Sequence, residues 1–431
     1  MKVYFLGIGG IGTSALAQYY LTNGHKVTGS DLVSSEITDD LIKKGAKIEI
    51  SNSKVKIPHD VDLVIHSPAV NINDYRLKTK NYKLRTLSYP QALGELTKKY
   101  FTIAVSGTHG KSTTTAMLSL LLARAGLDPT VIIGTKIKEF GNTNFRSGKS
   151  KYLVIEADEH FASFLNYWPR MIVLTNIDRD HLDYYKNLNN ILKAFKKYVS
   201  NLPEEGHLVI NADDENIWKI LDSKFNFQIS SYELEQPESR KLKKILKVPG
   251  EHNIYDALAA LTAARVLNIP DKTSFKALSE YNGAWRRFEI LKGVLGKKKI
   301  TIISDYAHNP AKVRAAMRAS REKFPKKEIW MIYQPHQHER TLFLFKEFIE
   351  VFRKNHLNKI IITDIFDVAG REKKGIRNKV DSRKLVLLIK KKNVIYLEND
   401  KVFPFLSKNF SGEVLAVVGA GDIYKLVEKL T

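Results

Sequence analysis

The stretch FTIAVSGTHGKSTTTAMLSLLLARA, Phe101–Ala125, determines the fold class that we expect for this chain. It begins with an apolar, β-prone run, passes through a loop with two glycines, and continues into a helical pattern. A strand, a glycine loop and a helix in this order can hold a polyphosphate, because the loop N–H groups and the helix N-terminus turn toward the anion. The stretch therefore predicts a nucleoside triphosphate site in an α/β fold.

The predicted phosphate loop comprises Gly107, Thr108, His109, Gly110, Lys111, Ser112 and Thr113. Lys111 supplies a mobile cation for the outer phosphates, and the Ser112 hydroxyl can join the coordination of Mg²⁺. The common P-loop pattern has a glycine where this chain has Val105, so the loop is a compressed variant. A serine-rich turn before a buried helix is the alternative, and the Gly-Lys-Ser-Thr-Thr run argues against it.

Length and composition limit the possible classes of protein. A chain of 431 residues is too long for one core, so we expect two or three domains. No apolar run reaches ~18 residues, and no membrane span is expected. The chain has no cysteine, which excludes disulfides and thiol catalysis and fits a reducing compartment, so we expect a cytoplasmic protein. The first residues imitate a secretion signal, but their glycine spacing is better explained by a nucleotide-binding loop.

The formal net charge of +23 raises the possibility of nucleic-acid binding. The lysines are scattered along the chain, however, and the clusters at 241–247, 297–299 and 390–392 lack interleaved aromatic residues for base stacking. We therefore expect solvated lysine faces and no nucleic-acid partner. The same positive field favours small anionic substrates.

Residues 1–95 are predicted to form a Rossmann-like domain that binds a nucleotide diphosphate. A strand at Val3–Leu6 precedes the glycine loop, a helix covers Thr13–Leu21, and a second strand starts at Lys26. The residues expected at the ligand are Gly7, Gly9, Gly10, Gly12, Asp31, which can bind a sugar hydroxyl, and Ser67 after a third strand. Taken alone, this fingerprint also fits an NAD-dependent oxidoreductase or an unliganded α/β domain.

Residues 96–290 are predicted to form a central ATP-binding domain with a mostly parallel sheet. Two nearly all-apolar runs, Tyr152–Ile155 and Met171–Leu174, are typical of buried parallel strands. Glu156 and His181 follow them, at the strand ends where ligands of open α/β sheets bind, and could converge on a metal. The alternative is an acidic helix cap and a surface histidine. Residues 224–247 are predicted to be irregular.

Residues 291–431 are predicted to form a second Rossmann-like domain, at the C-terminal end of the chain. Strands are expected at Lys299–Ser304, Glu328–Tyr333, Lys359–Thr363, Val394–Leu397 and Glu413–Val418. The loops after the first two, 305–310 and 334–341, are rich in groups that can hold a carboxylate or a ribose. Just before this domain, the arginine pair 286–287 can clamp phosphates.

In this order over the whole chain, the motifs resemble the Mur ligases, the ATP-dependent amide-forming enzymes of peptidoglycan synthesis. The motifs that carry the resemblance are GTHGKS at 107–112, EADE at 156–159, TNI at 175–177 with Asp180-His181, GEHN at 250–253, RRF at 286–288, DYAHNP at 305–310 and QPH at 334–336. Four features most resemble the members that add L-alanine to UDP-N-acetylmuramate: the histidine of the phosphate loop, the early glycine fingerprint, ASFL at 162–165 and QPH at 334–336.

The resemblance implies that the first domain binds the UDP-sugar, the central domain ATP, and the third domain the amino acid. It further implies that Lys111, His181, Arg287 and His308 are catalytic, that Mg²⁺ is held by Ser112, Glu156 and His181, that His252, Asp256 and Asp305 contact the adenosine, and that His336 and Arg340 face the amino acid. The implied reaction joins L-alanine to the lactyl carboxylate through an acyl phosphate. Oligomeric state is not predicted.

Some residues depart from the pattern of the alanine-adding members. Gln337 stands where those enzymes usually have an arginine, and Asp256 where an asparagine is usual. SYPQAL at 88–93 and GEHN at 250–253 are similar to the ligase that recycles the murein tripeptide. That ligase, and a non-catalytic nucleotide-binding protein, stay open as alternatives.

Overall fold

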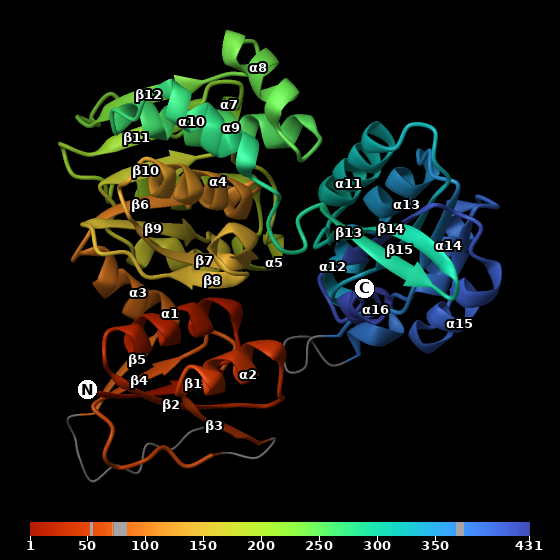
Figure 1. The fold of residues 1–431 in the computed structure, drawn as a ribbon, viewed down its shortest axis with the longest axis horizontal. Helices are drawn as coiled ribbons and strands as arrows, with labels where there is room; N and C mark the ends of the chain where they lie inside the picture. Colours follow the sequence, from red (N-terminus) through yellow and green to blue (C-terminus); the bar gives the residue numbers. More distant parts are fainter. Residues whose placement is uncertain (52–54, 71, 73–83, 368–374) are drawn as a thin grey trace. The chain divides into compact units, whose positions relative to one another are not determined.

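The computed structural model describes residues 1–431 apart from 52–54, 71, 73–83 and 368–374. It contains three sheets and divides into two compact units. The first unit comprises residues 1–247 and 251–281 and holds two of the sheets, and the second comprises 248–250 and 282–431 and holds the third. Figure 1 shows helices packed along the sheets in each unit. The predicted α/β fold with three sheet-containing domains is confirmed.

The first sheet is parallel and has the order β3-β2-β1-β4-β5. Chain order reverses between β1 and β4, and ligands of such sheets bind at this switch point beyond the strand carboxyl ends. Its strands are β1 (Lys2–Leu6), β2 (Lys26–Asp31), β3 (Lys47–Ile50), β4 (Leu63–His66) and β5 (Arg85–Ser88), and its helices are α1 (Ile11–Thr22), α2 (Glu36–Lys43) and α3 (Tyr89–Thr97).

Sequence signals explain where the second and third helices begin. Ser35 accepts a hydrogen bond from the Thr38 N–H at the start of α2, and Ser88 does the same with Gln91 at the start of α3. In both cases the third residue returns a bond to the cap, which is the reciprocal capping box. The SYPQAL segment is thus a helix start in this fold, with Pro90 in the first turn of α3, where its missing N–H costs little.

The central sheet has the order β12-β11-β10-β6-β9-β7-β8, parallel except for the β7–β8 pair. Its strands are β6 (Phe101–Ser106), β7 (Thr130–Ile137), β8 (Thr143–Arg146), β9 (Tyr152–Ala157), β10 (Met171–Leu174), β11 (His207–Asn211) and β12 (Gln228–Tyr232). The α-helices of this part are α4 (Lys111–Arg124), α5 (Leu182–Tyr185), α6 (Leu188–Val199), α7 (Glu215–Trp218), α8 (Pro237–Ile245), α9 (Glu251–Val266) and α10 (Asp271–Glu280). Short 3₁₀ segments are η2 (Lys138–Phe140) and η3 (His160–Asn166).

The sheet order places the phosphate loop between two other functional strand ends. β6, which carries the loop, lies between β9 and β10. All three strands are parallel and almost fully buried, as their apolar sequences predict. Their carboxyl ends therefore meet at one edge, and this edge holds the phosphate loop.

The third sheet has the order β13-β14-β18-β15-β16-β17, parallel except for the β13–β14 pair. Its strands are β13 (Glu289–Leu295), β14 (Lys298–Asp305), β15 (Ile329–Gln334), β16 (Lys359–Ile362), β17 (Val394–Tyr396) and β18 (Val414–Gly419). Its helices are α11 (Pro310–Lys323), α12 (His338–Phe343), α13 (Phe345–Arg353), η4 (Ile376–Asn378), α14 (Ser382–Ile389), α15 (Asn399–Asn409) and α16 (Tyr424–Leu430). The five predicted strands are present, and β13 was not predicted.

Two features differ from the sequence predictions. Residues 224–247 are not irregular, because β12 adds to the edge of the central sheet and α8 follows it. In α8 the apolar face is limited to a few residues such as Leu242 among lysines, which concealed the helical pattern. The predicted domain limits, 1–95, 96–290 and 291–431, stay predictions, although residues 282–290 group with the third sheet.

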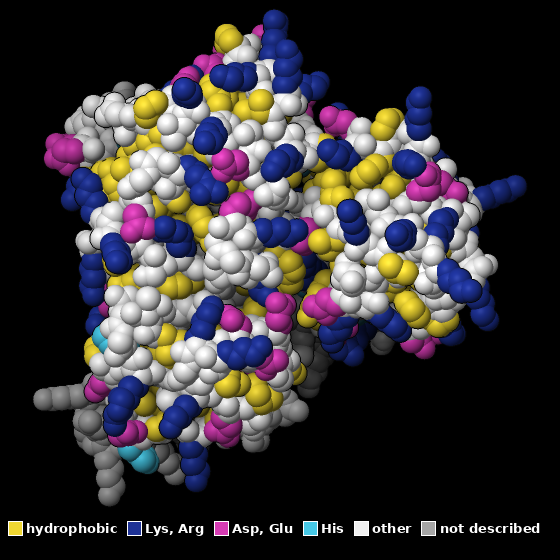
Figure 2. All heavy atoms as spheres, in the orientation of Figure 1, with side chains coloured by type: hydrophobic (Ala, Val, Ile, Leu, Met, Phe, Trp, Pro, Cys, Tyr) yellow, Lys and Arg dark blue, Asp and Glu magenta, His cyan; other side chains and the backbone are white. Residues whose placement is uncertain are grey.

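Basic side chains are spread over the face shown in Figure 2, mixed with acidic ones over both units. No helix within the described residues is long and apolar enough to cross a membrane.

Candidate nucleotide and amino-acid sites

The first glycine loop lies at the switch point of the first sheet. Gly7 and Ile8 donate their N–H groups to the Ser30 carbonyl at 2.9 and 3.1 Å, and Gly9 donates to Asp31 Oδ2 at 2.8 Å. Gly7 has a φ of +71°, and a Cβ atom added there would lie 3.0 Å from Ser67 Cβ. The residues predicted to hold the UDP-sugar are thus brought together from the ends of β1, β2 and β4.

The phosphate loop is fastened to the end of β10. Thr108 donates its N–H to the Asn176 carbonyl at 3.0 Å, and His109 donates to Asn176 Oδ1 at 2.9 Å. Gly107 has a φ of +135°, and a Cβ atom there would overlap Thr175 Oγ1. The loop conformation therefore requires a glycine at 107 and depends on residues just after β10, such as Asn176, which is 67 residues from His109 in the sequence.

Lys111, the first residue of α4, is held by carboxylates. Its Nζ donates to Glu159 Oε2 at 2.7 Å and to the Gly107 carbonyl at 2.6 Å, and lies 3.6 Å from Asp158 Oδ1. Burial lowers the pKa of the Lys111 ammonium, but the charges of Glu159 and Asp158 outweigh burial and hold the pKa above its ordinary value. Lys111 is therefore a fixed cation at the start of the helix.

Glu159 is the least solvated carboxylate of the site, with 2% of its surface exposed. Burial raises the pKa of Glu159 to about 8, Asp158 adds to the rise, and Lys111 opposes it. Its Oε1 makes no hydrogen bond within the described part of the chain and lies 3.7 Å from His181 Nε2. A buried carboxylate oxygen of this kind has room for one more positive partner.

The residues predicted to hold a metal fall into two neighbouring groups. Ser112 Oγ donates to Glu156 Oε1 at 2.8 Å, whereas His181 faces Glu159. Ligand atoms of Asp158, Glu159 and His181 lie within 4.8 Å of one another. Burial lowers the pKa of His181 to about 4, so its imidazole is neutral at neutral pH. The site has more carboxylates than the single Lys111 can neutralise. It is therefore suited to Mg²⁺, which prefers oxygen ligands.

His181 is held in place by a stack of rings. The His160 ring lies between Phe161 and His181, with centroid distances of 4.1 and 4.0 Å. Phe161, Ala162 and His181 all have left-handed backbone conformations, with φ between 50° and 54°. Such conformations cost on the order of 1 kcal/mol or more for a residue with a Cβ atom and gather at functional sites.

The two residues of α9 predicted to contact adenosine have different surroundings. Asp256 is buried, accepts a hydrogen bond from Thr114 Oγ1 at 3.1 Å, and lies so close to Gly110 that a Cβ atom there would overlap its Oδ1. His252 is exposed at the start of the helix, 3.2 Å from Asn253 Nδ2 through its Nε2. Asp256 thus supports the phosphate loop, and its predicted adenosine contact stays a prediction.

In the second unit, the arginine pair and Asp305 form one cluster around Tyr306. The guanidinium carbons of Arg286 and Arg287 lie 4.9 and 5.1 Å from the centre of the Tyr306 ring. Arg286 is buried and donates to the carbonyls of Gly419, at the end of β18, and Gly421, whereas Arg287 is half-exposed. Arg286 therefore has a structural role, and Arg287 is the cation that can reach a ligand.

Asp305 uses both carboxylate oxygens on backbone groups. Oδ2 accepts the Phe288 N–H at 2.8 Å and Oδ1 accepts the Ala307 N–H at 2.7 Å. Burial raises the pKa of Asp305 above its ordinary value.

The two residues predicted to face the amino acid, His336 and Arg340, and the predicted catalytic residue His308 lie beyond β15 and β14. Arg340 Nη1 and His336 Nδ1 are 3.1 Å apart, and the rings of His336 and His308 are 6.2 Å apart. β14 and β15 flank β18 in the sheet, so the loops that follow them meet at one edge. The structure thus brings the predicted His308, His336 and Arg340 together.

Sequence reasoning missed the partners of Lys111. It singled out Glu156 of the EADE segment, whereas Glu159 and Asp158 of the same segment contact the lysine. The repeated acidic residues after β9 were the signal that could have revealed them.

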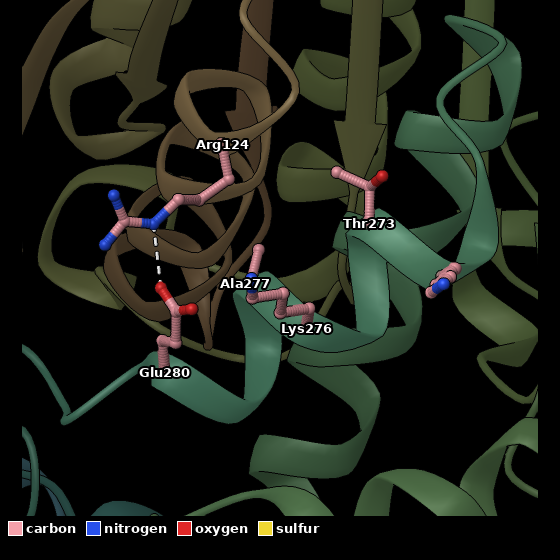
Figure 3. Close-up of a pocket in the computed structure, with 6 residues that line it drawn as sticks. Arg124, Thr273, Lys276, Ala277 and Glu280 are labelled. Atoms are coloured by element: carbon pink, nitrogen blue, oxygen red, sulfur yellow. Dashed lines mark hydrogen bonds and ion pairs between the residues drawn. The ribbon is translucent and has the colours of Figure 1, made fainter.

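One surface pocket lies away from these residues. It has a volume of about 530 Å³ and is lined by Arg124, Lys272, Thr273, Lys276, Ala277 and Glu280. In Figure 3, Arg124 points toward Glu280, and its Nε donates to Glu280 Oε2 at 2.7 Å. Because Arg124 and Lys111 are at opposite ends of α4, about 20 Å apart along the helix, the pocket is separate from the phosphate loop.

The fold and the residues described above define an α/β protein with a phosphate loop and a carboxylate cluster at the central sheet. Arginine and histidine side chains gather at the strand ends of the third sheet. Comparison with known families then places the chain. The Mur ligase middle domain matches residues 105–264, the Mur ligase family catalytic domain matches 2–101, and the Mur ligase glutamate ligase domain matches 286–421. The chain belongs to the Mur ligase family, a family of ATP-dependent ligases, and the resemblance seen in the sequence is confirmed.

Individual relatives agree with this family. The chain is 40% identical to the UDP-N-acetylmuramate–L-alanine ligase of Acetivibrio thermocellus, over 99% of this chain and 94% of that protein. It is 38% identical to the enzyme of the same name from Caldanaerobacter subterraneus, over 99% and 96%. The crystal structure of UDP-N-acetylmuramate–alanine ligase from Thermotoga maritima matches with a TM-score of 0.80 at 27% identity, covering 100% of this chain and 99% of that chain. A murein peptide ligase from Psychrobacter arcticus shares the fold, with a TM-score of 0.74 at 23% identity over 100% and 98%.

Proposed function

We propose that this chain joins L-alanine to the lactyl carboxylate of UDP-N-acetylmuramate and cleaves ATP to ADP and phosphate. The observation that carries the proposal is the phosphate loop, in which Lys111 lies among buried carboxylates, in a chain that matches alanine-adding relatives over nearly its full length. The cytoplasm, which supplies ATP and UDP-sugars, is the proposed compartment.

The positions of the residues support the following proposed roles. Gly7 to Gly12, Asp31 and Ser67 bind the UDP-sugar, and the phosphate loop binds ATP. Ser112 and Glu156, with His181 and Glu159 nearby, would hold Mg²⁺, which shields phosphate charge when it is bound. Lys111 stabilises the charge that develops on the transferring phosphoryl group, because it is fixed and poorly solvated.

The proposed reaction has two steps. The lactyl carboxylate oxygen attacks the γ-phosphorus, the bond to the ADP oxygen breaks, and an acyl phosphate forms. The amine of L-alanine then attacks the acyl carbon, loses a proton, and phosphate leaves. Arg287 is proposed to hold phosphate oxygens, His336 and Arg340 to hold the amino acid, and His308 to act as a catalytic residue. Holding the reactants in contact raises their effective concentration, to about 10⁵ M in well-oriented cases.

The test measures phosphate release from Mg-ATP with UDP-N-acetylmuramate, in parallel with L-alanine and with L-alanyl-D-glutamyl-diaminopimelate. We expect release with L-alanine, together with a new amide detected by mass spectrometry. Release with the tripeptide alone would assign the chain to peptide recycling. Release with neither amine, by a protein that still binds UDP-N-acetylmuramate, would leave a nucleotide-binding protein without this activity.

A further inference from the structure

Phe366 follows β16, and its backbone hydrogen bonds hold it beside His336, which is predicted to face the substrate amino acid. Its N–H donates to the Pro335 carbonyl at 2.8 Å, and its carbonyl accepts the Gln337 N–H at 2.8 Å. These bonds belong to a parallel bridge between His336 and Phe366 that extends the pairing of β15 with β16. The position of Phe366 is therefore set by the same loop that carries His336.

The Phe366 side chain is also fixed, between a histidine and a glycine. Its ring is nearly parallel to that of His336, with centroids 5.6 Å apart and an angle of 15°. On the side of β18, a Cβ atom added to Gly421 would overlap Phe366 Cγ. The absence of a side chain at 421 thus makes room for the ring at the strand ends of the third sheet.

An apolar ring and a group of polar side chains lie next to each other here. His336 approaches Arg340 at 3.1 Å and His308 at 6.2 Å, so polar and cationic groups gather next to Phe366. An α-amino acid has the matching division, since its carboxylate and amine need polar partners and its side chain needs an apolar wall. Phe366 is half-buried, and its ring stacks on His336, one of the two residues predicted to face the amino acid.

We propose that Phe366 is a specificity-determining residue of this ligase, whose ring limits the size of the side chain on the incoming amino acid and holds the His336 ring in place. The inference rests on the proposed function, because it takes His336 and Arg340 as the amino-acid site. A pocket wall that excludes one or two methyl groups discriminates by about 10–200-fold. That range sets the size of the expected effect.

The experiment compares wild type, Phe366→Ala, Phe366→Leu and Phe366→Tyr by phosphate release with L-alanine, glycine, L-serine and L-valine. For Phe366→Ala we expect the L-valine to L-alanine ratio of kcat/KM to rise about tenfold or more, because the wall is shortened. The KM for L-alanine should rise, while the KM values for ATP and UDP-N-acetylmuramate stay near wild type. Phe366→Tyr keeps the ring and should keep the wild-type ratio. Phe366→Leu removes the ring but leaves a smaller apolar side chain, so the ratio should rise by less than in Phe366→Ala, and this variant keeps the test valid if the alanine variant does not fold.

Phe405→Ala is the matched control, because Phe405 is a partly buried ring of α15 that packs against a hydrophobic cluster of the same sheet. Its ratio should equal that of wild type. The inference is overturned if wild type uses L-alanine but neither Phe366→Ala nor Phe366→Leu changes the ratio, or if Phe405→Ala changes it equally. If wild type releases phosphate with none of the amino acids, the proposed function fails, and this inference fails with it.

Discussion

The two glycine loops of the first unit look alike in sequence and differ in what surrounds them. In the loop at Gly7–Gly12, the N–H of Gly9 is taken by the carboxylate of Asp31, 22 residues further along the chain. In the loop at Gly107–Ser112, Lys111 contacts Glu159, which is 48 residues further along. One loop has an anion at its centre, and the other has a cation among anions.

This difference indicates what each loop can bind. A carboxylate that already accepts a loop N–H disfavours a highly charged phosphate at that point and can accept a sugar hydroxyl instead. A fixed lysine with surplus carboxylates suits a triphosphate that arrives with a divalent cation. Glycine spacing shapes each loop, but the charged side chain supplied by the neighbouring strand determines which ligand charge the loop favours.

The largest expected effect comes from removing the cation of the second loop. Lys111→Ala should lower the rate of phosphate release by about 10³-fold or more, because a fixed charge at the transferring phosphoryl group is lost. Binding of UDP-N-acetylmuramate to the first loop should stay unchanged, as measured by calorimetry. Lys151→Ala, an exposed lysine before β9, is the control and should behave as wild type. Loss of UDP-sugar binding in Lys111→Ala would show that the loops do not work separately.

The next effect tests the shape of the second loop. Gly107→Ala places a Cβ atom against Thr175 Oγ1 at a φ of +135°, so the loop must shift, and we expect ATP turnover to fall by about 100-fold. Gly126→Ala is the matched control, since Gly126 also has a positive φ, +79°, but nothing lies within 4 Å of the added atom. It should lower the midpoint of thermal unfolding slightly and leave turnover intact. If both variants lost turnover equally, backbone strain alone would explain the effect, and the contact with Thr175 Oγ1 would not be needed.

The two loops also show how far the sequence could predict the site. Glycine spacing and apolar strands predicted both loops and the order of elements around them, because these depend on neighbouring residues. The contact of Lys111 with Glu159 depends on β6 and β9 lying side by side, which no local pattern contains. The left-handed conformations of Phe161 and Ala162 could not be predicted for the same reason, since tertiary packing imposes them against local preference. Phe366 was missed because a single aromatic after a strand has no distinctive pattern.

A third effect depends on pH and belongs to the second loop only. Burial raises the pKa of Glu159 to about 8 against the opposing charge of Lys111, so the carboxyl group takes up a proton near neutral pH, and a bound cation would favour its charged form. Binding of Mg-ATP should therefore release protons at pH 7, and the affinity should rise by up to about tenfold per pH unit toward pH 8 and then level off. Calorimetry in two buffers with different ionisation enthalpies measures the proton count.

Glu159→Gln supplies the contrast for this measurement. Without an ionisable group at 159, the released protons and the slope of affinity against pH should both disappear. Binding of UDP-N-acetylmuramate to the first loop should show no such slope in either protein. A slope that persists in Glu159→Gln would assign the titration to another group.

The smallest effect is expected at the anion of the first loop. Asp31→Asn keeps the shape of the side chain, but its amide has one acceptor oxygen where the carboxylate accepts from both Gly9 and Leu32 at 2.8 Å. One of these N–H groups therefore loses its partner, which costs about 1 kcal/mol and corresponds to a KM for UDP-N-acetylmuramate raised by about fivefold. The KM for ATP should not change, because Lys111 and its carboxylates are built on other strands. If Asp31→Asn raised the KM for ATP as much as the KM for UDP-N-acetylmuramate, and also lowered the midpoint of thermal unfolding, Asp31 would act on the stability of the whole unit. Equal midpoints of thermal unfolding for variant and wild type would exclude that explanation.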